Sequence, residues 1–118
     1  MKKHVWKILG LVLFLTFAFY SLTLASEKDK VRFQGVIVEL DLKKKIMVIN
    51  ETTFFWNENT IFNTAKGVPI AVDRFKPKDW VYAEGEYDQR KKKVAATKIY
   101  LLPKYIEKKE RHLYPFMQ

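Results

Sequence analysis

The chain has 118 residues, no cysteine, and 22 lysines and arginines against 13 aspartates and glutamates, a formal charge of +9. This length accommodates one small domain, and a hydrophobic fraction of 48% is typical of a folded chain rather than a disordered one. The lack of cysteine excludes disulfides, thiolate zinc sites, thiol catalysis and attachment of a lipid to a cysteine.

The N-terminal segment has the order of a secretory signal peptide. Three lysines precede an uncharged apolar stretch over residues 8–20, and the small residues Thr23 and Ala25 follow it. We predict a signal peptide over residues 1–25, cleaved after Ala25, and then a short polar lead over residues 26–30. An uncleaved membrane anchor is the alternative, because the uncharged segment approaches the length of a spanning helix. In both cases the protein is exported, to the periplasm, the cell envelope or the medium.

The first predicted strand covers residues 31–42 and alternates apolar with polar residues. The phase of this alternation changes at Gly35, after which Val36, Val38 and Leu40 take the inward positions. We therefore expect a bulge or sharp coil at Gly35. A strand of this kind can begin in one sheet and end in another, as the first strand of a small closed barrel does.

Further strands and one helical turn follow, separated by polar or proline-containing turns. The predicted strands cover residues 46–50, 53–56, 80–87 and 93–102, with a short extended stretch at residues 61–62 and the helical turn at residues 70–75. The last two strands form a hairpin through residues 88–92, and Pro103 ends the second of them. Residues 103–118 form a tail in which Glu107 and Arg111, spaced i,i+4, favour a short helix.

These elements predict an all-β fold, a small five-stranded barrel over residues 31–102 with one short helical turn. The expected core is Val36, Val38, Leu40, Ile46, Val48, Val81, Ala83, Ile99 and Leu101. Val48→Asp is then expected to unfold the domain, because an unpaired buried charge costs several kcal/mol. The apolar residues of the tail are expected to cover one end of the barrel or to contact a partner; they are Leu113, Tyr114, Phe116 and Met117.

Four segments of the predicted barrel carry a resemblance to a known family; they are residues 35–38, 46–49, 79–86 and 94–99. They resemble a bacterial family of exported domains of unknown function, which implies an OB-like barrel and leaves the function open. Exported stress-related OB domains of bacteria share a shorter pattern, matched here by Pro77, Asp79, Val81 and Gly85. Lys78 stands where the first family usually has a glycine, so the turn before Asp79 can differ in geometry.

Beyond the predicted signal peptide, the chain lacks the parts of most catalytic sites. Its only serine there is Ser26 and its only histidine is His112, so a nucleophile–histidine pair and a zinc site of nitrogen and sulfur ligands cannot be assembled. Glu84 and Glu86 share a strand face at a spacing known from glycosidases, but exposure to solvent is the simpler interpretation. His112 and Tyr114 are similar to the haem-attaching histidine and the following tyrosine of some exported OB-fold haem chaperones. Their spacing differs from that of the chaperones, so a solvent-exposed histidine is the simpler interpretation. We predict no cofactor, no metal and no enzymatic activity.

The main positive signal is two basic loops, which comprise Lys43, Lys44, Lys45, Arg90, Lys91, Lys92 and Lys93. The first lies between the first two predicted strands, and the second lies in the last hairpin. In an OB barrel the corresponding loops border the usual binding face. Trp80 and Tyr82 point away from Val81 and Ala83 on their strand, so we expect them to be exposed and to contribute to ligand binding.

Basic loops around exposed aromatic residues suit an anionic wall polymer, an acidic glycan, a membrane surface or single-stranded nucleic acid. Export argues against nucleic acid. The plain alternative is that the lysines only solubilise a small barrel and protect its edges. The predicted function is a non-enzymatic exported binding or interaction module, whose partner is an anionic polymer, a membrane surface or a protein of the cell envelope. A binder of polyanions or single-stranded nucleic acid, and a cofactor carrier or enzyme, are the alternatives.

Overall fold

The computed structural model describes residues 29–118, so the predicted signal peptide or anchor lies outside the described residues, as does most of the predicted lead. The described chain is all-β, with one sheet and three short 3₁₀ helices. The strands are β1 (Lys30–Asp41), β2 (Ile46–Ile49), β3 (Thr52–Phe55), β4 (Ile61–Thr64), β5 (Trp80–Asp88) and β6 (Lys93–Leu102). The 3₁₀ helices are η1 (Val72–Arg74), η2 (Lys108–Leu113) and η3 (Pro115–Met117). Within residues 29–118, no helix has the length and apolar character that crossing a membrane requires.

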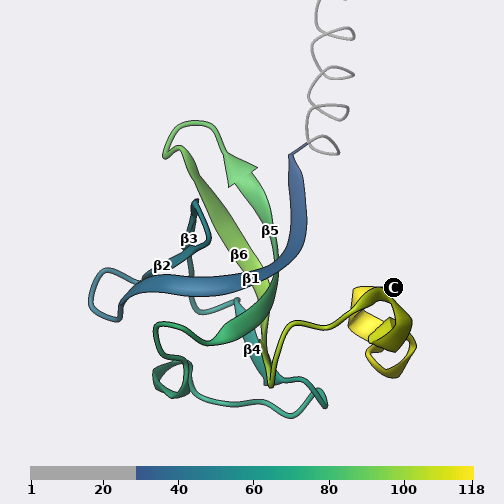
Figure 1. Cartoon of the computed structure of the whole chain (residues 1–118). Helices are drawn as coiled ribbons and strands as arrows, with labels where there is room; N and C mark the ends of the chain where they lie inside the picture. Colours follow the sequence, from purple (N-terminus) through teal and green to yellow (C-terminus); the bar gives the residue numbers. More distant parts are fainter. Residues whose placement is uncertain (1–28) are drawn as a thin grey trace, which may run out of the picture.

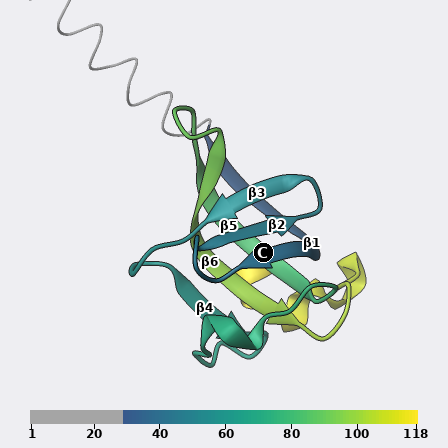
Figure 2. The ribbon, with the colours of Figure 1, turned by 90° about the vertical axis from the view of Figure 1, so that its left-hand side faces the viewer.

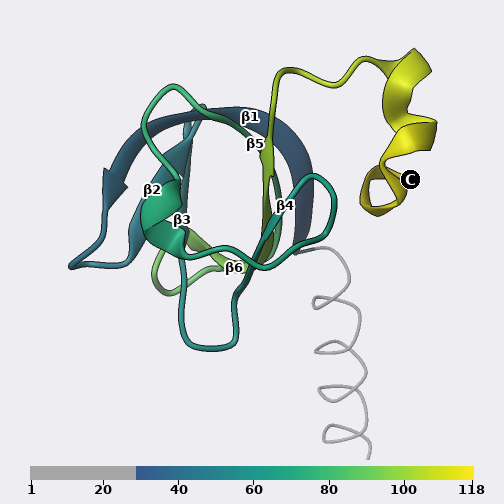
Figure 3. The ribbon, with the colours of Figure 1, turned by 90° about the horizontal axis from the view of Figure 1, so that it is seen from below.

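Five of the strands close into a ring, which Figure 3 shows from below. β1 pairs antiparallel with β2 and β5, β2 pairs antiparallel with β3, and β5 pairs antiparallel with β6. The ring closes where β3 runs parallel to β6, with Phe54 opposite Val94 and Phe55 opposite Ala95. β4 adds to β6 in parallel outside this ring. The prediction of an all-β chain is confirmed.

The register of β1 corrects one prediction. Gly35 does not change the phase of the strand, because Phe33 packs against the core and Ile37, four residues later, is buried in it. The irregularity falls instead between Ile37 and Glu39, where two steps along β1 match a single step along β2. Val38 is therefore the extra residue of a bulge. It is 54% exposed and does not belong to the core.

The core also uses the face of β2 opposite to the predicted one. Met47 and Ile49 are fully buried, whereas Ile46 and Val48 lie on the outer face and are half-buried. All four residues are apolar, so alternation could not distinguish the two faces. Of the predicted core, Val81, Ala83 and Ile99 are confirmed, Leu40 and Leu101 pack at its margin, and Val36, Val38, Ile46 and Val48 lie outside it.

The turn before β5 takes a conformation that favours glycine, although it contains none. Lys78 has a φ of +80°, in the left-handed region. Its amide donates to the carbonyl of Ile37 at 2.7 Å, and the amide of Ile37 donates to the carbonyl of Asp79 at 2.9 Å. These two hydrogen bonds tie the turn to the centre of β1. Lysine is thus held in the conformation that a glycine would adopt readily.

We expect Lys78→Gly to raise the free energy of unfolding by up to about 1 kcal/mol. The left-handed region costs a residue with a Cβ about 1–2 kcal/mol, and glycine removes this cost. The greater freedom of glycine in the unfolded chain offsets part of the stability gained in this way. Thermal unfolding of the variant and the parent measures the difference. Lys76→Gly, two residues earlier and without a positive φ, is the matched control and should destabilise slightly. A lower melting temperature for Lys78→Gly than for Lys76→Gly would contradict the assigned turn.

Candidate binding face

The outer side of β2 and β3 carries a small apolar surface. β1, β2 and β3 lie side by side in Figure 2. Because Phe54 is buried, its neighbour Phe55 faces outward, and it pairs with Ile46 on one side and with Ala95 of β6 on the other. We name the outward residues of these two strands the β2–β3 face; they are Ile46, Val48, Thr53 and Phe55.

Each of the two basic loops places one lysine beside Phe55. Lys45 immediately precedes β2, and its carbonyl accepts the amide of Trp56 at 3.1 Å. From the other side, the Nζ atom of Lys91 lies 4.4 Å from the centre of the Phe55 ring, a cation–π contact. The two loops are far apart in the sequence, yet they flank the same outward aromatic residue.

The two basic loops are built alike. Each begins with an aspartate at the end of a strand, whose carboxylate accepts a backbone amide of the loop. Asp41 accepts the amide three residues later at 3.0 Å, and Asp88 accepts the amide two residues later at 2.9 Å. Each loop also contains a lysine in the left-handed region, Lys45 with φ +57° and Lys92 with φ +54°. Such compact turns fix the positions from which the basic side chains extend.

Within residues 29–118 the charges of the basic loops have no ion-pair partner. The ion pairs of this region join Arg32 with Glu84, Lys104 with Glu110, and Lys109 with Glu107. Every basic residue of the two loops is exposed except Lys93, which is half-buried. Exposed charges of one sign that lie close together attract anions and raise their local concentration. The face therefore combines an aromatic centre with basic edges.

Trp80 and Tyr82 do not contribute to this surface, contrary to the expectation of exposure. Tyr82 is only 5% exposed, because the tail covers the outer side of β5. Its hydroxyl accepts a hydrogen bond from Nε of Arg32 at 2.9 Å, and the Phe116 ring lies 5.5 Å from its own ring. The half-buried Trp80 packs against Tyr105 with ring centres 5.4 Å apart. Neither ring is free to stack on a ligand while the tail is docked.

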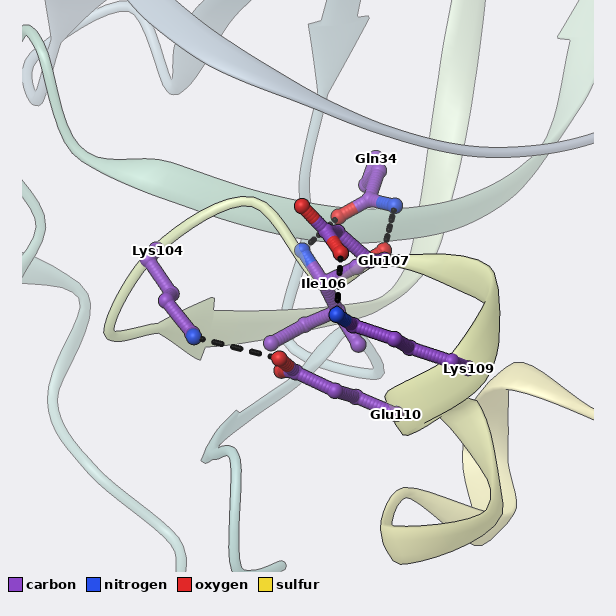
Figure 4. A network of polar contacts seen from close by, with 6 residues as sticks. All are labelled: Gln34, Lys104, Ile106, Glu107, Lys109 and Glu110. Atoms are coloured by element: carbon purple, nitrogen blue, oxygen red, sulfur yellow. Dashed lines mark hydrogen bonds and ion pairs between the residues drawn. The ribbon is translucent and has the colours of Figure 1, made fainter.

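One side-chain amide and one parallel aromatic stack are prominent among the contacts that hold the tail on the barrel. Oε1 of Gln34 accepts the amide of Ile106 at 2.9 Å, and Nε2 of Gln34 donates to the Ile106 carbonyl at 2.8 Å (Figure 4). Ile106 is fully buried. The Phe116 ring lies parallel to that of Tyr100, with centres 3.9 Å apart. The ion pairs drawn in Figure 4 lie on the exposed side and contribute little by comparison.

The tail covers the side of the barrel rather than its end. Figure 1 shows it projecting from the end of β6 and folding beside the sheet. Tyr114, Phe116 and Met117 pack against the buried pair Tyr82 and Tyr100, as expected of apolar tail residues. Leu113 takes no part in this contact and is 65% exposed. The short helix expected in the tail takes the form of the two 3₁₀ helices η2 and η3.

The residues considered for catalysis are not all brought together. Glu84 and Glu86 of β5 line one hollow beside β1, where Glu84 pairs with Nε of Arg32 at 3.5 Å, whereas His112 is exposed on η2. In the part of the chain that the structure describes, no group of three or more histidines, aspartates or glutamates could hold a metal ion.

Sequence reasoning chose Trp80 and Tyr82 as the exposed aromatic residues of the site and did not single out Phe55, which lies at the centre of the β2–β3 face. The signal was present, since Phe54 and Phe55 are adjacent on a predicted strand and one of them had to point outward. Its contact with Lys91 joins β3 to the loop between β5 and β6 and has no local signature.

Comparisons with known proteins add information about the fold. A scan against protein-family models finds no match, and neither does a search of curated proteins. Among solved structures, the chain is similar to the crystal structure of PilY2, a fimbrial biogenesis protein of Pseudomonas aeruginosa. The TM-score is 0.50 and the sequence identity 19%, with 75% of this chain and 95% of that chain covered. At this identity the likeness concerns the fold alone.

Proposed function

We propose that this chain is an exported, non-enzymatic binding module with an OB-like barrel, and that it binds an anionic polymer of the cell envelope at the β2–β3 face. The observation that carries the proposal is the position of Phe55 between the two basic loops, with Lys91 seated on its ring. The module would hold its ligand by charge attraction at the edges and by apolar contact at the centre.

The order of the ring supports the OB-like part of the proposal. The strands follow one another around the barrel as β1, β2, β3, β6 and β5, and η1 lies in the connection between β3 and β5. In OB barrels, oligonucleotides and oligosaccharides bind on the face of the second and third strands and on the loops 1–2 and 4–5. Because β4 lies outside the ring, β5 and β6 take the places of the fourth and fifth strands. The two basic loops then correspond to those two loops.

Two observations support a location in the cell envelope. The first is the N-terminal pattern of three lysines, an uncharged apolar stretch and small residues, which is typical of export. The second is the likeness in fold to PilY2, a protein described as acting in fimbrial biogenesis. For an exported domain we therefore place the ligand among the anionic polymers of the cell envelope rather than among nucleic acids.

The placement of the charges favours a polymer over a small anion. One basic loop lies at the β2 side of Phe55 and the other at the β6 side, so an extended ligand that crosses the face can contact both. Two weak contacts on one ligand reinforce each other through a high effective concentration. A small anion would contact one loop at a time and gain no such advantage.

We expect Lys91→Ala, Lys92→Ala and Lys93→Ala together to weaken binding of heparin, used as an acidic polysaccharide probe, by at least about tenfold at low salt. A matched control replaces the three tail lysines Lys104, Lys108 and Lys109 by alanine and should change the affinity by less than about twofold. Titrations at two salt concentrations should show a steep loss of affinity for the parent and a shallower loss for the loop variant.

Equal losses in the loop variant and the tail variant would contradict the proposed face, because they would reflect net charge alone. The same titration with a single-stranded oligonucleotide separates the alternatives. Much tighter binding of the oligonucleotide than of the polysaccharide would favour a function in binding single-stranded nucleic acid over the proposed binding of an envelope polymer.

A further inference from the structure

A cavity that is separate from the β2–β3 face lies where the tail meets the barrel. Its volume is about 390 Å³, within the range of small-molecule sites. The lining includes two arginines and several polar, aromatic or sulfur-containing side chains, namely Arg32, Arg111, Gln34, Tyr82, Tyr105 and Met117. None of the lining residues carries a carboxylate. The cavity is therefore basic on one part of its wall and apolar on another.

Arg111 lines this cavity and also carries a buried hydrogen-bond donor without a partner in the described part of the chain. Its Nε atom is buried and has no hydrogen-bond partner among the described residues. Native proteins pair nearly all such groups with protein, water or a ligand, because a buried unsatisfied N–H is destabilising. This donor therefore requires a partner, which a water or a ligand at the cavity would supply.

Arg32 is held at the same place by the barrel and the tail together. Its Nε donates to the Tyr82 hydroxyl at 2.9 Å, and its Nη2 donates to the main-chain oxygen of Gln118 at 3.3 Å. The side chain of Gln118 in turn donates to the main-chain oxygen of Arg111 at 3.3 Å, so both arginines share one neighbour. Glu84 neutralises part of the Arg32 charge at 3.5 Å and is not part of the cavity wall.

The guanidinium of Arg32 is charged, and Glu84 pairs with it on one side only, through Nε. Its hydrogen bond to Tyr82 raises the pKa of Arg32 above the ordinary value, so the side chain carries its charge throughout the accessible pH range. Planar guanidinium groups match the geometry of phosphate and carboxylate oxygens better than any other side chain does.

We propose that this cavity binds a small amphiphilic oxyanion, a phosphate or carboxylate joined to an apolar group. The oxyanion would accept hydrogen bonds from Arg111 and Arg32, and the apolar group would lie against Tyr105 and Met117. Because the tail supplies Tyr105, Arg111 and Met117, the ligand would also hold the tail on the barrel. This site takes a small ligand and does not depend on the basic loops.

The test is a titration of the ¹⁵N-labelled full chain with phenyl phosphate, followed at the Nε–H resonances of its arginines. Benzoate is the carboxylate arm, and inorganic phosphate and phenol are the two halves of the probe. We expect saturable shifts at Arg111 and Arg32, with no shift at Arg74 and Arg90, which lie outside the cavity. Phenyl phosphate or benzoate should bind at least about tenfold more tightly than either half alone.

Arg111→Gln should weaken this binding at least about tenfold, and Arg90→Gln should leave it unchanged. Trp80 fluorescence checks that the tail remains docked in Arg111→Gln, because Trp80 contacts Tyr105. If the tail is released, Arg111→Lys, which keeps the charge, provides the comparison. The proposal is overturned if the Arg111 Nε–H resonance does not shift up to about 10 mM of either probe, or if all four arginines shift alike.

Discussion

Met47→Asp is expected to unfold the domain, whereas Val48→Asp leaves it folded. Met47 is fully buried in the cluster that fills the barrel, where an unpaired carboxylate costs several kcal/mol. That cost is comparable with the whole stability of a small domain, about 5 kcal/mol. Val48 faces outward between Glu39 and Thr53, and an aspartate there stays hydrated. We expect it to cost about 1 kcal/mol through the lost apolar contact and the repulsion by Glu39.

Circular dichroism with thermal unfolding distinguishes the two variants directly. Met47→Asp should lack a cooperative transition, and Val48→Asp should retain one within several degrees of the parent. The reverse result would restore the phase of β2 that the sequence pattern predicts and would turn the proposed outer face into the core.

Gly85→Ala is expected to lower the free energy of unfolding by about 2–3 kcal/mol or more. A Cβ at this position would overlap the carbonyl oxygen of Ala95 and lie 2.7 Å from Cγ1 of Val94. The carbonyl oxygen of Ala95 belongs to the backbone and cannot rotate away as a side chain can. β5 and β6 would therefore have to separate at the irregularity between Glu84 and Gly85. The displaced part of β6 includes Val94 and Ala95, which close the ring against β3.

Gly67→Ala provides the comparison for this prediction. Gly67 has a φ of +83°, but the space that an added Cβ would occupy is open, so alanine there meets only the conformational cost of about 1 kcal/mol. Denaturant unfolding should rank Gly85→Ala as the more damaging change. A larger loss of stability in Gly67→Ala than in Gly85→Ala would contradict the close approach of β5 to β6 at Gly85.

The elements that could be predicted from the sequence are those with a clean alternation or a strong breaker. β6 ends before Pro103 as expected, and on β5 the inward residues are Val81 and Ala83, with Tyr82 opposite. β2 could not be oriented in this way, because each of its four residues is apolar and either face can serve as core. On β1 the sequence predicts a bulge at Gly35, because a glycine within a strand is the usual marker of such a feature. The bulge lies at Val38 instead.

The sequence predicts the basic loops of the candidate site but does not single out the aromatic residue at its centre, Phe55. Loops rich in lysine can be recognised from local composition alone. The burial of Tyr82 could not be, because it depends on a tail held by the contact of Gln34 with Ile106, 72 residues away. Phe55 likewise acquires its role from Lys91, which lies in the loop between β5 and β6. Contacts of this range follow from the topology of the barrel, which local patterns do not contain.

The central claim, that an anionic polymer binds on the β2–β3 face, is tested most directly by mapping. The ¹⁵N-labelled chain is titrated with a short heparin oligosaccharide at low salt, and the backbone amide resonances are followed. We predict shifts at residues 43–46, 53–56 and 90–94, with no change in the tail at residues 105–117. Shifts centred on the tail, shifts spread evenly over all basic residues, or no shifts at all would contradict the proposed binding face.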